Sequence, residues 1–214
     1  MTPTPGKPQA HPSATAAPTT KPGTARASYA NGELRRDQII DAAMAVFGEQ
    51  GFTRTSLRTI AERAGTSHVS LMHHFGSKEV LFQRVLERRE TLNRAALSDE
   101  FAAADLEEAV AMMMRRNVAA PGLVHLDTTV TAEAIIPTHP AHAYIERVFA
   151  DFVSEVTARL EREQAAGQLR EGLNLPVVAR QFVALLEGIQ TQWLYDPGVD
   201  MELHMQEFLK LLKR

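Results

Sequence analysis

Apolar residues recur at intervals of three and four along most of this chain, and that spacing predicts helices rather than strands. In the first half it predicts a long helix, two short helices and a second long helix, which cover 34–50, 57–64, 67–75 and 78–97. The two short helices flank a turn that contains Gly65. Gly51 ends the first long helix, and Gly76 ends the second short helix. Two short helices joined by a tight turn and supported by a longer one can place one helix in the DNA major groove.

The second half of the chain carries the same kind of pattern. It predicts five more helices, which cover 105–120, 123–136, 141–166, 176–195 and 200–214. Asp105 and Asp200 are suited to cap the first and the last of these helices. No segment shows the alternation of a strand, and no repeat of about 20–50 residues is present. The chain is therefore predicted to be all-α, with about nine helices.

The second of the two short helices has a well-defined outer face. Ser67 stands where an N-cap belongs, and Leu71 and Phe75 lie four residues apart, so both are expected to face the core. The side chains that then point outward are those of His68, Ser70 and His73, with Met72 near the boundary. A polar, exposed helix after a tight turn favours a DNA-reading role.

Residues 34–81 resemble the N-terminal domain of the TetR family of transcriptional regulators. The resemblance rests on an ordered set of positions: Ile40, Ala42, Ala43, Phe47, Gly51, Phe52, Thr55, Ile60, Ala61, Ala64, Gly65, Ser67, Leu71, His74, Phe75, Lys78 and Leu81. The rest of the chain matches the family in helical character and length, with a looser similarity to actinobacterial-type members near its end. The resemblance implies a three-helix helix-turn-helix DNA-binding domain at 31–77, a connecting helix at 78–98, and a helical ligand-binding and dimerisation domain at 99–214.

Docking geometry then assigns expected DNA contacts. In a helix-turn-helix, the start of the second helix approaches base edges while the flanking residues grip phosphates. His68 and Ser70 can donate and accept hydrogen bonds, and Val69 can contact a thymine methyl group. Phosphate contacts are expected from residues on either side of this helix, namely Thr55, Ser56, Arg58 and Lys78. The other members of the expected DNA-binding set are Ser67, Met72, His73 and His74.

Two of these positions depart from the family pattern. Met72 stands where the family usually has tyrosine, and a thioether cannot donate a hydrogen bond to the DNA backbone. Val69 stands where small residues or proline are common, so its bulk would narrow the operator sequence or shift the helix. His74, by contrast, matches the structural histidine of the family.

Charge is distributed unevenly along the chain. The net charge is −3. Residues 1–30 hold three basic and no acidic residues, 31–94 hold ten basic and eight acidic, and 95–214 hold ten basic and eighteen acidic. This asymmetry would turn the first half toward a polyanion. In the connecting helix, the arginines expected on a solvated face are Arg84, Arg88, Arg89 and Arg94.

The first thirty residues have a composition unlike the rest. They contain six of the eleven prolines and little apolar surface, so 1–30 is predicted to be a disordered tail. Lys7, Lys21 and Arg26 could touch phosphates, although a solvated tail without a role is the favoured interpretation.

Several classes of function are disfavoured. The chain has no cysteine, which excludes disulfides and thiol catalysis and fits a reducing cytosol. With the DNA binding that the family resemblance implies, the expected location is the cytoplasm, in association with the nucleoid. No apolar run approaches the roughly 18–20 residues that span a membrane, and no signal-peptide core is present. No phosphate-binding glycine loop or nucleophile–base spacing indicates an enzyme. The His73–His74 and His139–His142 pairs lack further ligands, so neither a metal site nor a cofactor is expected.

A ligand pocket is expected within the second domain. The candidate lining residues are Met113, His125, Thr129, Glu133, Phe149, Phe152 and Trp193. Methionines and aromatic rings suit an adaptable apolar cavity, but the same spacing also fits an ordinary core. Glu133 stands apart, because it could face solvent, form a buried pair or bind a cation.

The family resemblance also implies partners. It implies a homodimer through the last two helices, a near-palindromic operator and a small-molecule ligand that releases a repressor from DNA. The last helix has apolar residues to spare for such a contact, namely Leu203, Phe208, Leu209 and Leu212. The alternative is a DNA-binding regulator without small-molecule control, which acts through a protein partner or as an activator.

Overall fold

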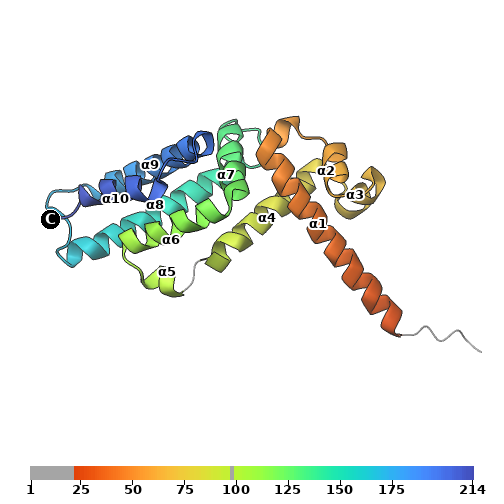
Figure 1. The fold of residues 1–214 in the computed structure, drawn as a ribbon, viewed down its shortest axis with the longest axis horizontal. Coiled ribbons are helices and arrows are strands. Elements are labelled where there is room, and N and C mark those ends of the chain that lie inside the picture. Colours follow the sequence, from red (N-terminus) through yellow and green to blue (C-terminus); the bar gives the residue numbers. More distant parts are fainter. Residues whose placement is uncertain (1–21, 97–98) are drawn as a thin grey trace, which may run out of the picture. The chain divides into compact units, whose positions relative to one another are not determined.

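The computed structural model describes the backbone of residues 22–96 and 99–214, and these residues form ten helices (Figure 1). Their bounds are α1 Pro22–Arg54, α2 Leu57–Arg63, α3 His68–Phe75, α4 Lys78–Ala96, α5 Asp99–Ala103, α6 Leu106–Ala119, α7 Pro121–Glu133, α8 His142–Ala165, α9 Leu175–Tyr195 and α10 Met201–Lys210. In these two ranges, β structure is limited to one isolated bridge between Leu169 and Lys213. The all-α fold class is therefore confirmed.

The nine helices expected from the sequence are all present, and a tenth is added. The short helix α5 was not predicted, because five residues are too few to show a periodic apolar pattern. Helix α1 begins at Pro22 rather than at residue 34. Of the expected tail, 1–21 lies outside the described residues, and 22–30 is helical instead of disordered. Pro22 is the last proline before residue 121 and suits a first helical turn, so no later proline interrupts α1, which kinks only at Gly51.

One hydrophobic core joins the helices of the expected DNA-binding domain. Ile39 and Phe47 of α1, Ile60 of α2, Leu71 of α3 and Phe82 of α4 are all fully buried in it. The rings of Phe47 and Phe82 meet edge to face with centroids 5.0 Å apart, a favoured aromatic geometry. Leu126 and Val130 of α7 belong to the same core, so α7 packs directly on the DNA-binding helices.

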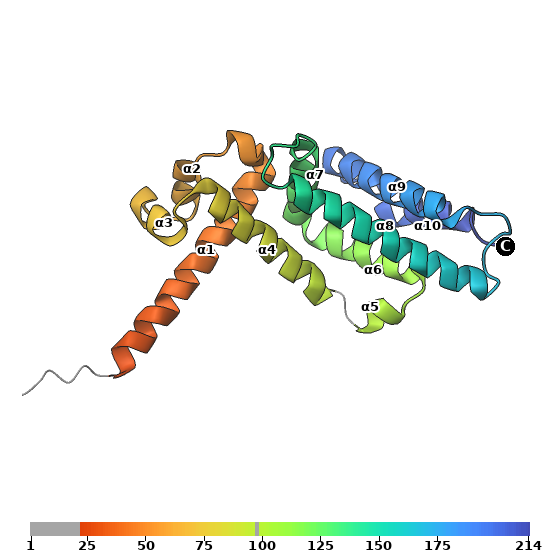
Figure 2. The same cartoon turned by 180° about the vertical axis from the view of Figure 1, so that it is seen from behind.

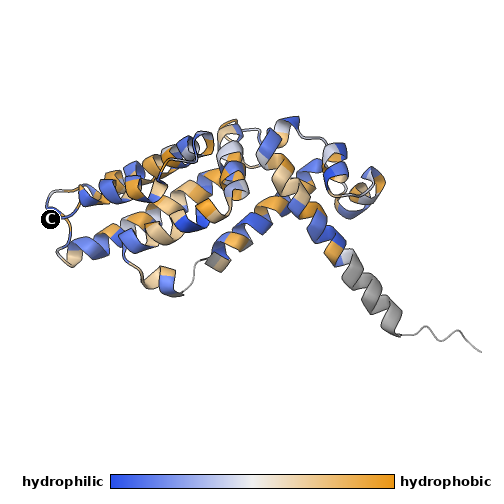
Figure 3. Ribbon diagram, in the orientation of Figure 1, coloured by the Kyte–Doolittle hydropathy of each residue, from blue (hydrophilic) through white to orange (hydrophobic). Residues whose placement is uncertain are grey.

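A second core lies among α6, α8, α9 and α10, which run side by side in both views (Figures 1 and 2). The buried face of α9 includes Val178, Phe182, Leu186, Ile189 and Trp193, which recur at intervals of three and four residues. Apolar and polar residues form stripes along these helices (Figure 3). Burial of one stripe per helix is what the three- and four-residue spacing predicts.

Candidate nucleic-acid interface and ligand cavity

Helix α3 is held at both ends by local structure. Ser67 has extended backbone angles, and its hydroxyl accepts the Ser70 N–H at 3.1 Å. Gly76 ends the helix with a φ of 74°. Leu71 and Phe75 are buried as predicted, and the Arg36 guanidinium lies 5.3 Å from the centre of the Phe75 ring. The helix is therefore fixed by its inner face and its caps.

The outer face of α3 is open to solvent. His68, Val69, Met72 and His73 are exposed, while Ser70 and His74 are half-buried. Val69 is 77% exposed, and Met72 is 37% exposed. Neither Val69 nor Met72 belongs to the hydrophobic cores that the described residues form. This placement agrees with the expected reading face.

The expected phosphate contacts before α3 divide into two groups. Ser56 caps α2 and is exposed, and Arg58 forms an ion pair with Glu62 at 3.1 Å in which both side chains are exposed. Such a pair contributes little to stability, so a phosphate can compete for the guanidinium. Thr55 does not reach the surface. It is 3% exposed, and its hydroxyl donates to the Gly51 carbonyl at 2.6 Å, which corrects the phosphate role expected for it.

Lys78 has a structural role that sequence reasoning missed. Its ammonium group donates to the carbonyl oxygens of Phe52 at 3.0 Å and Thr55 at 3.1 Å. It also lies 4.3 Å from the centre of the Phe52 ring. An ammonium group has three donors, so one N–H remains for a phosphate. Lys78 therefore connects the start of α4 to Phe52 near the end of α1 and to Thr55 just after it.

The contact between α1 and α7 depends on two residues that were expected in the ligand pocket. The Glu133 carboxylate accepts the Phe52 N–H at 2.6 Å, and the Thr129 hydroxyl donates to the Gly48 carbonyl at 3.0 Å. His139, whose side chain is 5% exposed, lies 3.6 Å from the Glu133 carboxylate through Nε2. Burial lowers the pKa of His139, and the Glu133 charge opposes that shift. Of the three interpretations of Glu133, the buried pair fits best.

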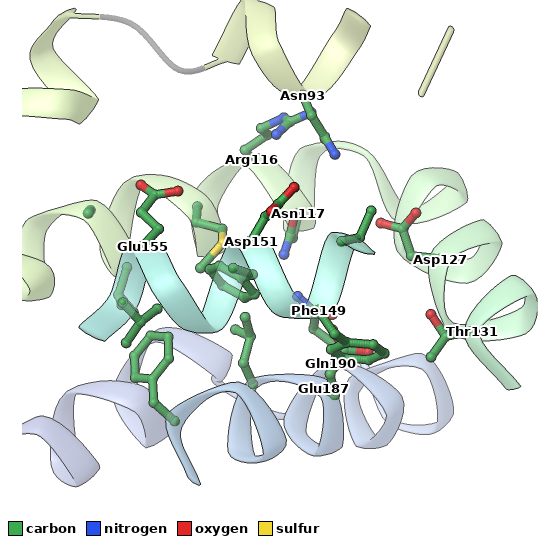
Figure 4. A pocket seen from close by; sticks show the side chains of 18 of the residues that line it. Asn93, Arg116, Asn117, Asp127, Thr131, Phe149, Asp151, Glu155, Glu187 and Gln190 are labelled. Carbon is green, nitrogen blue, oxygen red and sulfur yellow. The ribbon is translucent and has the colours of Figure 1, made fainter. Parts of the chain in front are cut away.

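A cavity of about 500 Å³ lies between α4, α6, α7, α8 and α9 (Figure 4). Met113, Phe149 and Phe152 line it, as the sequence predicted. The other four expected residues do not line it. Thr129 and Glu133 hold α1, His125 is exposed on the surface, and Trp193 is buried in the second core.

One end of the cavity is polar. The Arg89 Nε donates to the Asp127 carboxylate at 2.6 Å, and Nη2 donates to its second oxygen. Arg89 is thus half-buried in an ion pair rather than part of the solvated face that we expected. Tyr144, Glu187 and Gln190 complete this end. No local sequence pattern indicates this group, because its members come from four different helices.

Glu187 has an unusual charge state. Burial, and then the negative charge of Asp127, raise the pKa of its carboxyl to about 7, while Arg89 opposes the shift. Burial likewise raises the pKa of Tyr144. A cavity wall that contains a carboxyl near half-ionisation at neutral pH is a candidate ligand site.

A capped and exposed helix after a tight turn, joined to a helical domain with a cavity, defines a helix-turn-helix transcriptional regulator. The comparisons agree with this class. The family of bacterial regulatory proteins described as the tetR family matches residues 39–85. The chain is 30% identical over 160 residues to the HTH-type transcriptional repressor AcnR of Corynebacterium diphtheriae, which covers 72% of this chain and 78% of the relative. The chain belongs to the TetR family.

Two further relatives support this assignment. A transcriptional repressor of Mycobacterium tuberculosis is 28% identical over 158 residues, which are 72% of this chain and 80% of the relative. A TetR-family regulator of Agrobacterium tumefaciens has a similar solved structure, with a TM-score of 0.73 and 17% identity. The likeness covers 86% of this chain and all of that one, and it concerns the fold. The helices in residues 22–96 and 99–214 are each too short or too polar to span a bilayer.

Proposed function

We propose that this protein is a ligand-controlled repressor that binds a near-palindromic operator as a homodimer. A small molecule in the cavity would release it from DNA. The observation that carries this proposal is the placement of the cavity of about 500 Å³, whose walls include α4 and α7. These two helices also pack on the DNA-binding helices, so a ligand that moves them would move α3.

Helix α7 has two functional faces. Asp127 and Thr131 face the cavity, whereas Thr129 and Glu133 bond to the end of α1. Helix α4 also connects the cavity to the DNA-binding helices. Its first residue, Lys78, bonds to the Thr55 carbonyl just before α2, and its later residue Arg89 lines the cavity. A ligand can shift the protein toward the released state only by binding that state more tightly. Contacts of the ligand with α4 and α7 would supply this difference in affinity between the two states.

The proposed DNA contacts follow the exposed residues. His68, Val69 and Ser70 at the start of α3 would read base edges, with Met72 and His73 further along the same face. Ser56, Arg58 and the free N–H of Lys78 would hold phosphates. Ser67 and His74 would support the helix, one as its cap and the other from a half-buried position.

The proposed dimer contact centres on the exposed stripe of α9. Its members are spaced alternately by four and three residues, and they are Val177, Gln181, Ala184, Gly188, Thr191 and Tyr195. That spacing is typical of helices that pack along a seam. Tyr195 is 88% exposed, and outside the adjacent turns of α9 no atom of the described residues lies within 4 Å of a Cβ built on Gly188. A second copy that approaches closely would account for a glycine at the centre of a long helix.

In the proposed dimer, helix α10 and the residues after it would offer fewer apolar contacts than we expected from the sequence. Leu209 and Leu212 are buried in the second core, and Phe208 is half-buried against it. Leu203 and Leu211 are exposed and remain available. Two recognition helices in a symmetric dimer would meet half-sites about 34 Å apart, which requires a near-palindrome.

The functional divisions that we propose are 31–77 for DNA reading, 78–98 for the connection, and 99–214 for ligand binding and dimerisation. Operator binding would place the protein in the cytoplasm with the nucleoid. In this arrangement no part of the cavity performs catalysis.

Selection of genomic DNA fragments with the purified chain tests the proposal. The expected result is a single near-palindromic operator, from which small molecules release the protein. The variant Met113→Trp, which fills part of the cavity, should weaken that release while leaving operator binding intact. If no compound changes the operator affinity of either protein, ligand control is wrong. The favoured function then becomes regulation through a protein partner or by activation.

A further inference from the structure

Most charged groups around the cavity already have partners. Arg89 pairs with Asp127, Arg94 with Glu90, and Arg159 with Glu155. Arg116 donates to the side chain of Asn93 at 2.9 Å. These groups are neutralised or hydrogen-bonded within the protein, although Arg89 Nη1 is buried without a hydrogen-bond partner among the described residues. Arg147 and Asp151 also line the cavity, and both are exposed to solvent.

Glu187 differs from these groups. Within the described parts of the chain, no hydrogen bond or ion pair reaches its carboxylate, although its side chain is half-buried in the cavity wall. Figure 4 shows Glu187 and Gln190 on α9, with Asp127 and Thr131 on α7 to one side. A carboxylate removed from water without a partner is unfavourable, and a cation is the group that would compensate it.

The rest of the cavity suits the apolar part of such a ligand. Phe149 and Phe152 on α8, Phe182 on α9 and Tyr144 on α8 all line it. Aromatic rings attract cations through their negative faces as well as packing on alkyl groups. The wall therefore combines a half-buried carboxyl without a partner, that of Glu187, with several aromatic rings.

An anionic ligand fits this wall poorly. Arg89 is committed to Asp127 through two of its nitrogens, so most of its charge is already compensated within the protein. A ligand carboxylate would also add a negative charge beside Glu187 and Asp127. A neutral ligand could hydrogen-bond to Glu187 but would not compensate its negative charge.

We propose that the ligand of this cavity is an organic cation: an apolar molecule with one ammonium group that pairs with Glu187. This inference rests on the proposed ligand-controlled function and names its ligand class. Asp127, which is already neutralised by Arg89, has a supporting electrostatic role, and the aromatic rings hold the apolar part.

Three probes of equal chain length test the ligand class. Octyltrimethylammonium, octanol and octanoate are titrated into the full chain by calorimetry. Octyltrimethylammonium should bind most tightly of the three. Glu187→Gln should weaken its binding by at least about tenfold, because the charge is lost while the shape is kept. Asp151→Asn is the matched control. Asp151 lines the same cavity but is exposed, so its neutralisation should leave the affinity unchanged.

The pH dependence gives a second readout that depends on Glu187. The charged and titratable groups that face it are Arg89 from α4, Asp127 from α7 and Tyr144 from α8. Since octyltrimethylammonium keeps its charge, its affinity should follow ionisation of the Glu187 carboxyl, whose pKa is about 7. The affinity should rise by up to about tenfold per pH unit below that value and level off above it. Glu187→Gln should remove this dependence.

The results test two claims separately: that the ligand is an organic cation, and that a ligand releases the protein from its operator. Tighter binding of octanoate or octanol, an unchanged affinity in Glu187→Gln, or no binding of octyltrimethylammonium at millimolar concentration would overturn the cation inference. If octyltrimethylammonium binds through Glu187 but the operator complex persists, the ligand class holds and the proposed release is wrong. If octanoate releases the operator, the release holds and the ligand class is wrong.

Discussion

Gly51 is the residue where the DNA-binding helices meet α7. Its φ of 77° and ψ of 166° lie in a region that is essentially restricted to glycine. A Cβ at this position would lie 2.2 Å from an oxygen of Glu133. The carboxylate that accepts the Phe52 N–H therefore occupies the space that a side chain would need.

Gly51→Ala should destabilise the fold more than an alanine at another glycine with positive φ. Backbone strain of this kind costs roughly 1–3 kcal/mol, and displacement of Glu133 adds to it. Gly76→Ala is the matched control, since Gly76 has a φ of 74° and open space around it. Urea unfolding of both variants gives the comparison. Equal losses would show that Glu133 moves away without cost.

Glu187 makes the stability of the protein depend on pH. Its carboxyl has a pKa of about 7 in the folded chain against an ordinary value of 4.5, so the folded state binds more protons between these values. Stability should therefore fall as the pH rises through this window. Glu187→Gln should raise the free energy of unfolding at pH 8 by about 1–3 kcal/mol and change it little at pH 4. Thermal unfolding at both pH values checks this, and an equal effect at both would contradict it.

The sequence indicated the exposed residues of α3 better than the roles of its neighbours. His68 and Val69 are exposed because helical spacing and one N-cap fix which face is buried. Thr55 and Lys78 could not be placed in this way, because their hydrogen bonds run to the carbonyls of Gly51 and Phe52. Those carbonyls can accept side-chain donors because the chain leaves the helix at Gly51.

At the scale of elements, α9 has two faces with different tasks. One face is buried in the second core, and the opposite stripe from Val177 to Tyr195 is exposed or half-buried. A glycine inside a helix costs about 1 kcal/mol relative to alanine. Among the residues that the structure describes, no neighbour of Gly188 comes close enough to require a glycine there.

Gly188→Leu should therefore abolish the dimer without unfolding the monomer, because the new side chain would separate the two copies of α9. Analytical ultracentrifugation of the variant should give a monomer with weakened operator binding. Ala95→Leu, which adds similar bulk at an exposed position of α4, should stay dimeric. A dimeric Gly188→Leu would exclude α9 from the interface.

Apart from the start of α1, helix boundaries were predicted to within a few residues where caps or prolines mark them. Asp105 caps α6 and Asp200 caps α10, each through a side chain that accepts a backbone N–H. The cavity was less predictable. Met113, Phe149 and Phe152 follow helical spacing, but Arg89 and Asp127 are 38 residues apart in the sequence and meet only after α4 packs against α7. Tertiary packing, rather than local pattern, determines that end of the cavity.

At the scale of the whole molecule, DNA affinity should depend on salt through a few cations. Arg58→Ala should weaken binding across operator sequences and reduce the salt slope by about one unit. The thermal stability of the Arg58→Ala variant should hardly change, since the ion pair between Arg58 and Glu62 is exposed. Lys78→Ala should also lower the melting temperature, because two carbonyls lose their donor. Operator titrations at several salt concentrations test both variants, and an unchanged slope would remove the residue from the interface.

The exposed valine on α3 has a consequence for epigenetic marks on the operator. On the proposed docking, the Val69 isopropyl group meets the 5-methyl group of a thymine. 5-Methylcytosine carries its methyl group at the same ring position. A half-site in which this thymine is replaced by cytosine should therefore bind weakly and regain affinity when that cytosine is methylated. For a half-site of that kind, methylation of the chromosome would itself set the degree of repression.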